Sequence, residues 1–185
     1  MQDQTFDRID FTRTPLAKEA YEYCTFNQCD LSNCDLSTIK FVECEFKSCN
    51  LSMAELKNAA FRDVKFRDCK MLGLKFETCQ ALAVLVSFEN CILNHSSFHH
   101  LKLKKTPFKN SQLHEADFTG CDLTAIVFDH CDLSRAIFNN TILEKADFRT
   151  AYNYSIDPEN NRLRKARFSL QGVVGLLEKY GVEVE

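Results

Sequence analysis

A five-residue period runs through most of this chain and limits what it can fold into. Large apolar residues, mostly Phe and Leu, recur at every fifth position, and a small or apolar residue stands two positions before each of them. None of these preceding positions is charged. The large residues form two runs: Phe26, Leu31, Leu36, Phe41, Phe46, Leu51, Leu56, Phe61, Phe66, Met71 and Phe76, and then every fifth residue from Phe88 to Phe148. Spacings of five and ten drift around a 3.6-residue helix, so the repeat predicts the inward positions of a coil instead.

A second period, of twenty residues, predicts four sides for each turn of the coil. In the first run the large residues follow the order Phe, Leu, Leu, Phe twice, so Phe26, Phe46 and Phe66 should stack in one column. In the second run Phe and Leu alternate strictly, which on four sides places Phe on two opposite columns. Bulky columns beside slimmer ones fill a square section at interior density. The fold class predicted is therefore all-β, a four-sided β-solenoid.

The repeat divides the chain into three segments. Residues 1–20 keep part of the register but lose the small inward residue, so we expect an irregular cap on the first coil. Residues 21–150 form the β-helix, with an interruption at 80–86 that is either a bulge packed on the coil or an exposed apolar binding loop. Residues 151–185 hold turn-forming residues and then an apolar periodicity that predicts a short C-terminal α-helix, N-capped by Ser169 and ended by Gly181.

The predicted C-terminal helix has one apolar face, for which two uses are open. The face consists of Leu170, Val173, Val174, Leu177 and Tyr180. It can plug the last coil, or it can pair with a second copy across a two-fold axis. Gly172 and Gly175 on its flank permit a close approach of another backbone. We predict a homodimer through this face, because Val182 and Val184 extend the apolar surface beyond what a plug requires.

Ten cysteines and five histidines are the candidates for chemistry. All ten cysteines stand at the small inward position, where Cys acts as a small buried apolar residue. The closest pairs, such as Cys24 and Cys29, are five apart on adjacent sides, unlike the spacing of zinc ligands. The histidines should face outward or lie in corner turns: His95, His99, His100, His114 and His130. A surface metal site from the first three is the alternative. We predict no catalytic, cofactor-binding or metal site and no enzyme activity, because a filled solenoid has no cleft.

The overall charge and hydropathy point to a cytoplasmic protein. The formal net charge of -3 is too mild to indicate a nucleic-acid binder. No signal peptide is visible at the N-terminus, and no apolar run approaches the length that spans a bilayer. We therefore expect no direct binding to nucleic acid or to a membrane.

Several units resemble the consensus of the pentapeptide-repeat family: A-D-F-T-G at 116–120, C-D-L-T-A at 121–125, C-D-L-S-R at 131–135 and A-D-F-R-T at 146–150. The size, the interruption, the ending N-Y-S-I-D-P-E-N-N-R and the closing G-L-L-E-K-Y-G-V-E-V are similar to the quinolone-resistance (Qnr) and microcin-immunity members of that family. The resemblance implies a right-handed quadrilateral β-helix that dimerises through its closing helix. It also implies that the dimer binds DNA gyrase or topoisomerase IV in place of duplex DNA, which protects the enzyme from inhibitors such as fluoroquinolones.

In a DNA mimic, acidic side chains stand in for phosphates and attract the basic surface of the enzyme. Residues 106–150 carry seven acids against four bases, and we assign these acids to a partner-binding face: Glu115, Asp117, Asp122, Asp129, Asp132, Glu144 and Asp147. A basic spot at Lys102, Lys104 and Lys105 does not suit such a mimic. The alternative function is a general protein-protein interaction scaffold with a partner other than a topoisomerase.

Overall fold

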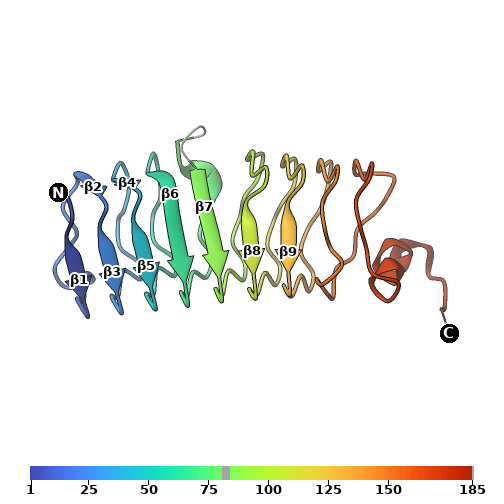
Figure 1. Cartoon of the computed structure of the whole chain (residues 1–185), viewed down its shortest axis with the longest axis horizontal. Helices are drawn as coiled ribbons and strands as arrows, with labels where there is room; N and C mark the ends of the chain where they lie inside the picture. The colour runs from blue at the N-terminus through green and yellow to red at the C-terminus, as the bar shows by residue number, and fades with distance from the viewer. Residues whose placement is uncertain (81–83, 185) are drawn as a thin grey trace.

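The computed structural model describes residues 1–80 and 84–184, and it shows a rod with the two termini at opposite ends (Figure 1). The backbone winds as a coil whose neighbouring turns pair in parallel. Phe6 pairs with Phe26 and Phe26 with Phe46, so one turn takes twenty residues. Four five-residue sides fill one such turn. The predicted all-β parallel solenoid is confirmed.

The regular strands lie on two adjacent sides of the coil. One side carries β1 (Thr5–Asp7), β3 (Thr25–Asn27), β5 (Glu45–Lys47), β6 (Ala60–Arg67), β7 (Val84–Glu89), β8 (Pro107–Lys109) and β9 (Val127–Asp129). The adjacent side carries β2 (Ala20–Glu22) and β4 (Lys40–Val42). β2 pairs with β4, and β4 pairs with the first residues of β6, which continues around the corner between the two sides. The other two sides are joined by single parallel bridges, such as Asp30 to Asn50 and Asp35 to Glu55. Most strands have three residues because a corner follows every five.

We name the four sides A to D by their inward columns. Side A holds nine phenylalanines: Phe6, Phe26, Phe46, Phe66, Phe88, Phe108, Phe128, Phe148 and Phe168. Side B runs from Phe11 to Leu133, side C from Leu16 to Phe138, and side D from Tyr21 to Leu163. Successive rings of side A lie 4.5–5.5 Å apart between centroids, so they form one continuous stack along the rod.

The second aromatic column changes sides at the middle of the rod. In the first half Phe41 of side D meets Phe26 and Phe46 edge to face, at 5.8 and 5.3 Å between ring centroids. In the second half Phe98 of side C takes this place, at 5.9 Å from Phe108. Edge-to-face pairs are favoured by the ring quadrupole, so both arrangements fill the same section. The change from adjacent to opposite columns follows the change in the order of Phe and Leu along the sequence.

The corners of the coil are made by residues in the left-handed conformation. Most residues two positions after an inward large residue have φ between about 50° and 65°, for example Asn33, His95 and Asn140. Only two of the glycines, Gly73 and Gly120, take such corner positions. Left-handed backbone costs roughly 1 kcal/mol for a residue with a Cβ, so the packing between coils has to offset this at every corner.

The sequence interruption coincides with a longer turn. Phe66 pairs with Phe88, a step of 22 residues in place of twenty, and the register of β6 against β7 shifts between Phe61 and Val64. Val84 and Val86 are buried, whereas Leu85 is 63% exposed. Residues 81–83, in the middle of the predicted bulge or binding loop, lie outside the described residues.

The parallel pairing of the coil includes residues of both predicted end segments, 1–20 and 151–185. Within residues 1–20, β1 pairs with β3, and Phe11 and Leu16 are buried. Beyond residue 150, Ile142 pairs with Arg162 and Asp147 with Arg167. The rod is therefore longer at both ends than residues 21–150.

The predicted C-terminal α-helix is wrong. The tail forms two consecutive 3₁₀-helices, η2 (Gly172–Leu176) and η3 (Glu178–Tyr180), and the described residues contain no α-helix. Gly172 and Gly175 lie so close to Tyr154 that a Cβ at either position would clash with it. Two glycines and two β-branched valines in five residues also make a weak α-helix former. The expected ends hold: Ser169 Oγ accepts the Gly172 N–H at 2.9 Å, and Gly181 is left-handed. In the part of the chain that the structure describes, no helix is long and apolar enough to cross a membrane.

Candidate interaction surface

The acids assigned to a partner-binding face are built into the corner turns of the coil. Asp117, Asp122, Asp132 and Asp147 each accept, through Oδ1, the backbone N–H of the residue two positions later, at 2.8–3.2 Å. Such turns satisfy a backbone donor that the corner leaves without a ladder partner. The Asp of each A-D-F or C-D-L unit therefore has a structural role.

Three of these four aspartates also contact a cation or a histidine. Lys104 lies 2.9 Å from Asp122, and His114 lies 2.9 Å from Asp132. Asp147 contacts Arg149 at 2.8 Å and Arg167 at 3.1 Å. The hydrogen bonds from Arg149 lower the pKa of Asp147, against the opposing effect of burial. For Asp122, burial raises the pKa, but the hydrogen bonds of Thr124 and Lys104 outweigh it and lower the pKa. The carboxylates of Asp122 and Asp147 stay ionised, and neighbouring cations balance their charge locally.

The structure does not bring the seven acids together on one face. The bridges place Asp147 on side A, Asp132 on side B, Asp117 on side C and Asp122 on side D. Glu115 stands at a corner between His95 and Arg135, at 3.3 Å from each. Asp129 contacts His130 at 2.7 Å. Glu144 is half-buried beside Lys145. The acids are distributed around the rod, as the five-residue spacing of Asp117 and Asp122 on a four-sided coil already indicates.

A ladder of ion pairs follows side A. Arg67 lies between Glu45 and Glu89, at 3.2 and 3.5 Å, and Lys109 contacts Glu89 at 2.9 Å. These outward residues are stacked by the pairing of β5, β6, β7 and β8. Opposite charges on neighbouring strands stabilise a sheet modestly. Side A is therefore a charged but locally neutral surface.

The predicted dimer residues remain exposed in the single chain. Leu170 is 85% exposed, and Val173, Val174, Leu177 and Tyr180 are between 37% and 52% exposed. The glycine side of the tail packs inward, where the Ile156 N–H donates to the Gly175 carbonyl at 2.9 Å. Lys179 contacts Asp157 at 2.5 Å and Glu159 at 2.7 Å, which fastens the tail to the preceding turn. The tail thus closes the rod with one side and leaves its apolar side uncovered.

The cysteines lie where the sequence placed them. Nine are buried, and Cys34 is half-buried near the N-terminal end. Burial raises the pKa of Cys44 to about 11 and that of Cys121 and Cys131 to about 12. Thiolates are the reactive form, so these thiols are poor nucleophiles and metal ligands at neutral pH. Among the described residues, no group of three or more His, Cys, Asp or Glu could hold a metal ion.

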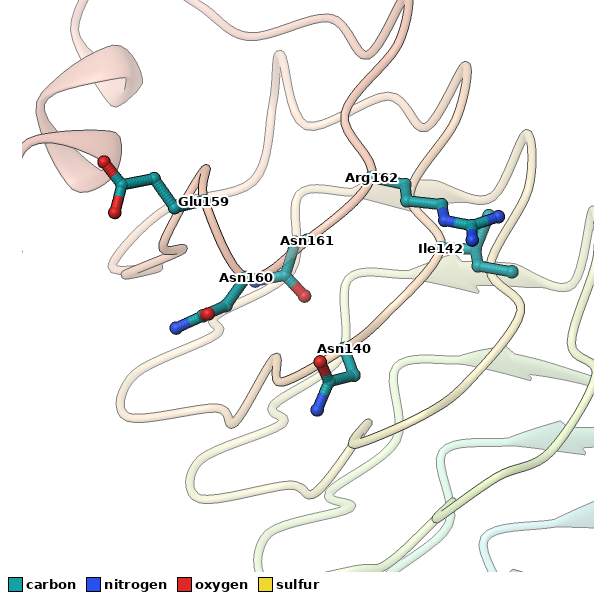
Figure 2. Close-up of a pocket in the computed structure, with 6 residues that line it drawn as sticks. All are labelled: Asn140, Ile142, Glu159, Asn160, Asn161 and Arg162. Carbon is teal, nitrogen blue, oxygen red and sulfur yellow. The ribbon is translucent and has the colours of Figure 1, made fainter.

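The hollows of the surface carry no constellation of reactive groups. One of about 320 Å³ lies between the turn at residues 159–162 and the preceding turn of the coil, and Figure 2 shows the six residues that line it. The hydrogen-bonding groups of its buried residue Asn161 are satisfied within the protein. The Asn161 amide nitrogen donates to the carbonyls of Phe138 and Asp157, and the Asn161 side-chain oxygen accepts the Thr141 N–H. A wider hollow of about 670 Å³ lies near the N-terminus, beside Leu16 and Cys34.

Parallel pairing every twenty residues, left-handed corners and filled inward columns define a solenoid repeat protein. The sequence profile described as "Pentapeptide repeat region" matches residues 19–86 and 75–148, and the chain belongs to this family. No curated protein matches the sequence significantly.

Two solved structures of QnrB1, a plasmid-mediated fluoroquinolone resistance protein, resemble the rod along its length. The trypsin-treated form is 20% identical with a TM-score of 0.65, over 100% of this chain and 97% of that chain. The full-length form is 19% identical with a TM-score of 0.65, over 98% of this chain and 99% of that chain. At this identity the likeness shows the fold.

Proposed function

We propose that this protein binds a type II topoisomerase, DNA gyrase or topoisomerase IV, and modulates it or protects it from inhibitors such as fluoroquinolones. The observation that carries the proposal is the resemblance to QnrB1, which extends over the whole chain and includes both ends of the rod. QnrB1 is described as a fluoroquinolone resistance protein. The resemblance of the repeat units and of the closing segment to that group points in the same direction.

The dimensions of the rod support this proposal. Side A has eight steps from Phe6 to Phe168, each about 4.8 Å, which gives about 38 Å for the column. Two rods joined at their tails have about twice that length, comparable to about 22 base pairs of duplex DNA. The exposed apolar side of the tail, centred on Val174 and Leu177, offers the surface for such a joint. Its burial between two copies removes that surface from water.

The distribution of acids gives the proposal partial support. Carboxylates stand on all four sides of the rod and are fixed by corner turns, as phosphates surround a duplex at fixed positions. A basic surface of the enzyme can meet them without an entropy cost for ordering long side chains. Cations near these carboxylates offset part of their charge. Because the remaining attraction to a basic surface is electrostatic, the binding of the enzyme should weaken as the salt concentration rises.

The pairing of the acids also favours a second candidate, an interaction scaffold for a partner other than a topoisomerase. Asp122, Asp132 and Asp147 contact Lys104, His114 and Arg149 instead of facing solvent alone. A surface of balanced charge suits recognition by shape and hydrogen bonds more than capture by a basic groove.

A competition experiment distinguishes the two candidates. The purified protein is added to immobilised gyrase and, separately, to immobilised topoisomerase IV, with and without a competing linear duplex. A DNA mimic binds at least one enzyme and is displaced by the duplex, because both occupy the same surface. Binding that the duplex leaves unchanged contradicts mimicry, and the absence of binding to both enzymes leaves the scaffold as the function.

A further inference from the structure

One side of the rod collects cations in its C-terminal half. The inward column of side D there consists of Leu103, Leu123, Leu143 and Leu163, and the parallel bridges run from Lys102 through Asp122 and Ile142 to Arg162. The outward residues that flank this column lie on one surface. Seven of them are basic: Lys102, Lys104, Lys105, Lys145, Arg162, Arg164 and Lys165. We name these seven residues the basic face.

The cations of the basic face are stacked by the coil. Lys105, Lys145 and Lys165 stand at the same left-handed corner in three of four successive turns, with φ of 59°, 60° and 61°, and Ala125 takes this corner in the turn between Lys105 and Lys145. The Lys105 N–H donates to the carbonyl of Thr124, and the Lys145 N–H donates to that of Arg164. Neighbouring turns lie about 4.8 Å apart, so the basic face extends over about 14 Å along the rod.

Most of these cations have no carboxylate partner. Lys104 contacts Asp122 at 2.9 Å, whereas the other six are exposed and make no ion pair within the part of the chain that the structure describes. Side A differs, because there Arg67, Lys109 and Arg149 each contact a carboxylate. Lys145 and Lys165 are directly stacked, and like charges on neighbouring turns repel one another, so this arrangement of unpaired cations disfavours the folded rod. A polyanion bound across the basic face removes that repulsion.

The basic face also separates charge across the molecule. Its seven cations and the two acids among them, Asp122 and Glu144, give it a net charge of +5. The whole chain carries -3, so the rest of the molecule carries -8. A hollow of about 210 Å³ lies on the same surface, lined by Glu144, Lys145, Arg164 and Lys165.

We propose that the basic face binds the phosphate backbone of duplex DNA without sequence preference. The outward residues around it include no aromatic side chain on which an unpaired base could stack, so a single strand is not the ligand expected. Ile142, the one outward aliphatic side chain of any size within the basic face, is half-buried. Leu85, which is 63% exposed, lies one turn before Lys105, so vesicles of anionic lipid are the competing ligand in the test below. The basic face is one side of a four-sided coil and its residues form no helix that could enter a groove, so its cations should contact phosphates.

This inference departs from the expectation of no direct nucleic-acid binding. The repeat visible in the sequence ends at residue 150, so only the structure places Arg162, Arg164 and Lys165 beside Lys145. The proposal does not depend on the proposed function, because it concerns the protein and DNA alone.

The test is a titration of a labelled duplex of about 25 base pairs with the full chain, by fluorescence anisotropy at several salt concentrations. Neutralising about four or five phosphates gives a slope of about -4 for log affinity against log salt. The variant Arg162→Glu, Arg164→Glu, Lys165→Glu should lower affinity at least about tenfold at about 50 mM salt and reduce the slope by about three. The matched control is Lys57→Glu, Lys70→Glu, Lys75→Glu, which makes the same charge change at exposed, unpaired positions on sides B and C.

The proposal stands if the first variant loses affinity and the control stays within about twofold of the parent. Equal losses in both variants overturn it, because binding then follows net charge and not the basic face. The absence of binding to duplex at about 50 mM salt also overturns it, as does binding only to vesicles of anionic lipid. Circular dichroism of each variant confirms that the rod is folded.

Discussion

The coil from Phe26 to Phe148 buries each of its large inward side chains to 4% exposure or less, whereas the tail leaves Leu170 at 85% and Tyr180 at 52%. Both regions are rich in apolar residues. In the coil every apolar column is covered by the next turn, so the surface needs no further partner. The tail has no next turn, and only its glycine side is covered. The coil therefore covers its own apolar columns, whereas the tail leaves one apolar side uncovered.

The largest expected effect comes from a charge in the coil. Phe118 is fully buried and stacks between Phe98 and Phe138, at 5.1 and 5.3 Å between ring centroids. Phe118→Asp buries an unpaired carboxylate and should cost more than about 4 kcal/mol, enough to unfold the rod. Far-UV circular dichroism measures the loss. Phe118→Leu is the control and should cost less than about 2 kcal/mol. A soluble Phe118→Asp variant that keeps its full β-structure would contradict the inward assignment.

A charge in the tail should separate two copies without unfolding either. Leu177 is 37% exposed on the apolar side of the tail. Leu177→Arg should halve the mass in light scattering, while the β signal stays unchanged, because the coil does not depend on this side chain. Ile137→Arg makes the same change at a 42% exposed apolar position on the coil and should leave the mass unchanged. If the parent and Leu177→Arg have the same mass, the tail only plugs the rod.

A smaller effect is expected where the tail contacts the coil. A Cβ at Gly175 would clash with the backbone oxygen of Tyr154, so Gly175→Ala has to move the tail away from it. We expect a local loss of about 1–3 kcal/mol, seen as faster hydrogen exchange after residue 168 with an unchanged coil. Gly181→Asn is the control, because it has no neighbour within 4 Å and Asn tolerates left-handed backbone. Equal exchange in parent and Gly175→Ala would show that the contact is weak.

The smallest effect concerns the N-terminal end at low pH. Hydrogen bonds from Lys18 and Ser37 lower the pKa of Asp35 to about 2. A carboxyl whose pKa is lower in the folded state stabilises the fold above about pH 4, and this stabilisation is lost as the pH falls through the folded pKa. Asp35 is 63% exposed, so Asp35→Asn should cost no more than about 0.5 kcal/mol at neutral pH and nothing below about pH 2.

Thermal melting from about pH 7 to pH 2 checks this prediction. Asp63→Asn is the matched control, because Asp63 is exposed at a left-handed corner that Asn also tolerates. A penalty for Asp35→Asn that grows toward low pH would contradict the sign of the effect.

The sequence predicts the coil well because the same pattern of a small and a large inward residue repeats every five positions. The fifth-residue positions and the positions two before them determine the four columns, and the exchange of Phe between columns is visible in their order. The structure of the tail was harder to predict. Val173, Val174 and Leu177 have the spacing of an α-helix, but the close contact of Gly172 and Gly175 with Tyr154, which accompanies the 3₁₀-helices, is a tertiary contact that the sequence does not reveal. The candidate surface was the least predictable part. The four-sided repeat places Asp117 and Asp122 on different sides, but the contact of Asp122 with Lys104 is a property of the fold, and Arg162 lies beyond the repeat visible in the sequence, three turns of coil from Lys102.

The most direct test of the proposed function is DNA supercoiling by gyrase in the presence of this protein, with and without a fluoroquinolone. The proposal predicts that about micromolar protein or less inhibits supercoiling or restores it in the presence of the drug, and that Leu177→Arg weakens the effect. No change at protein concentrations up to about tens of micromolar, with folded dimeric protein, would contradict the proposal.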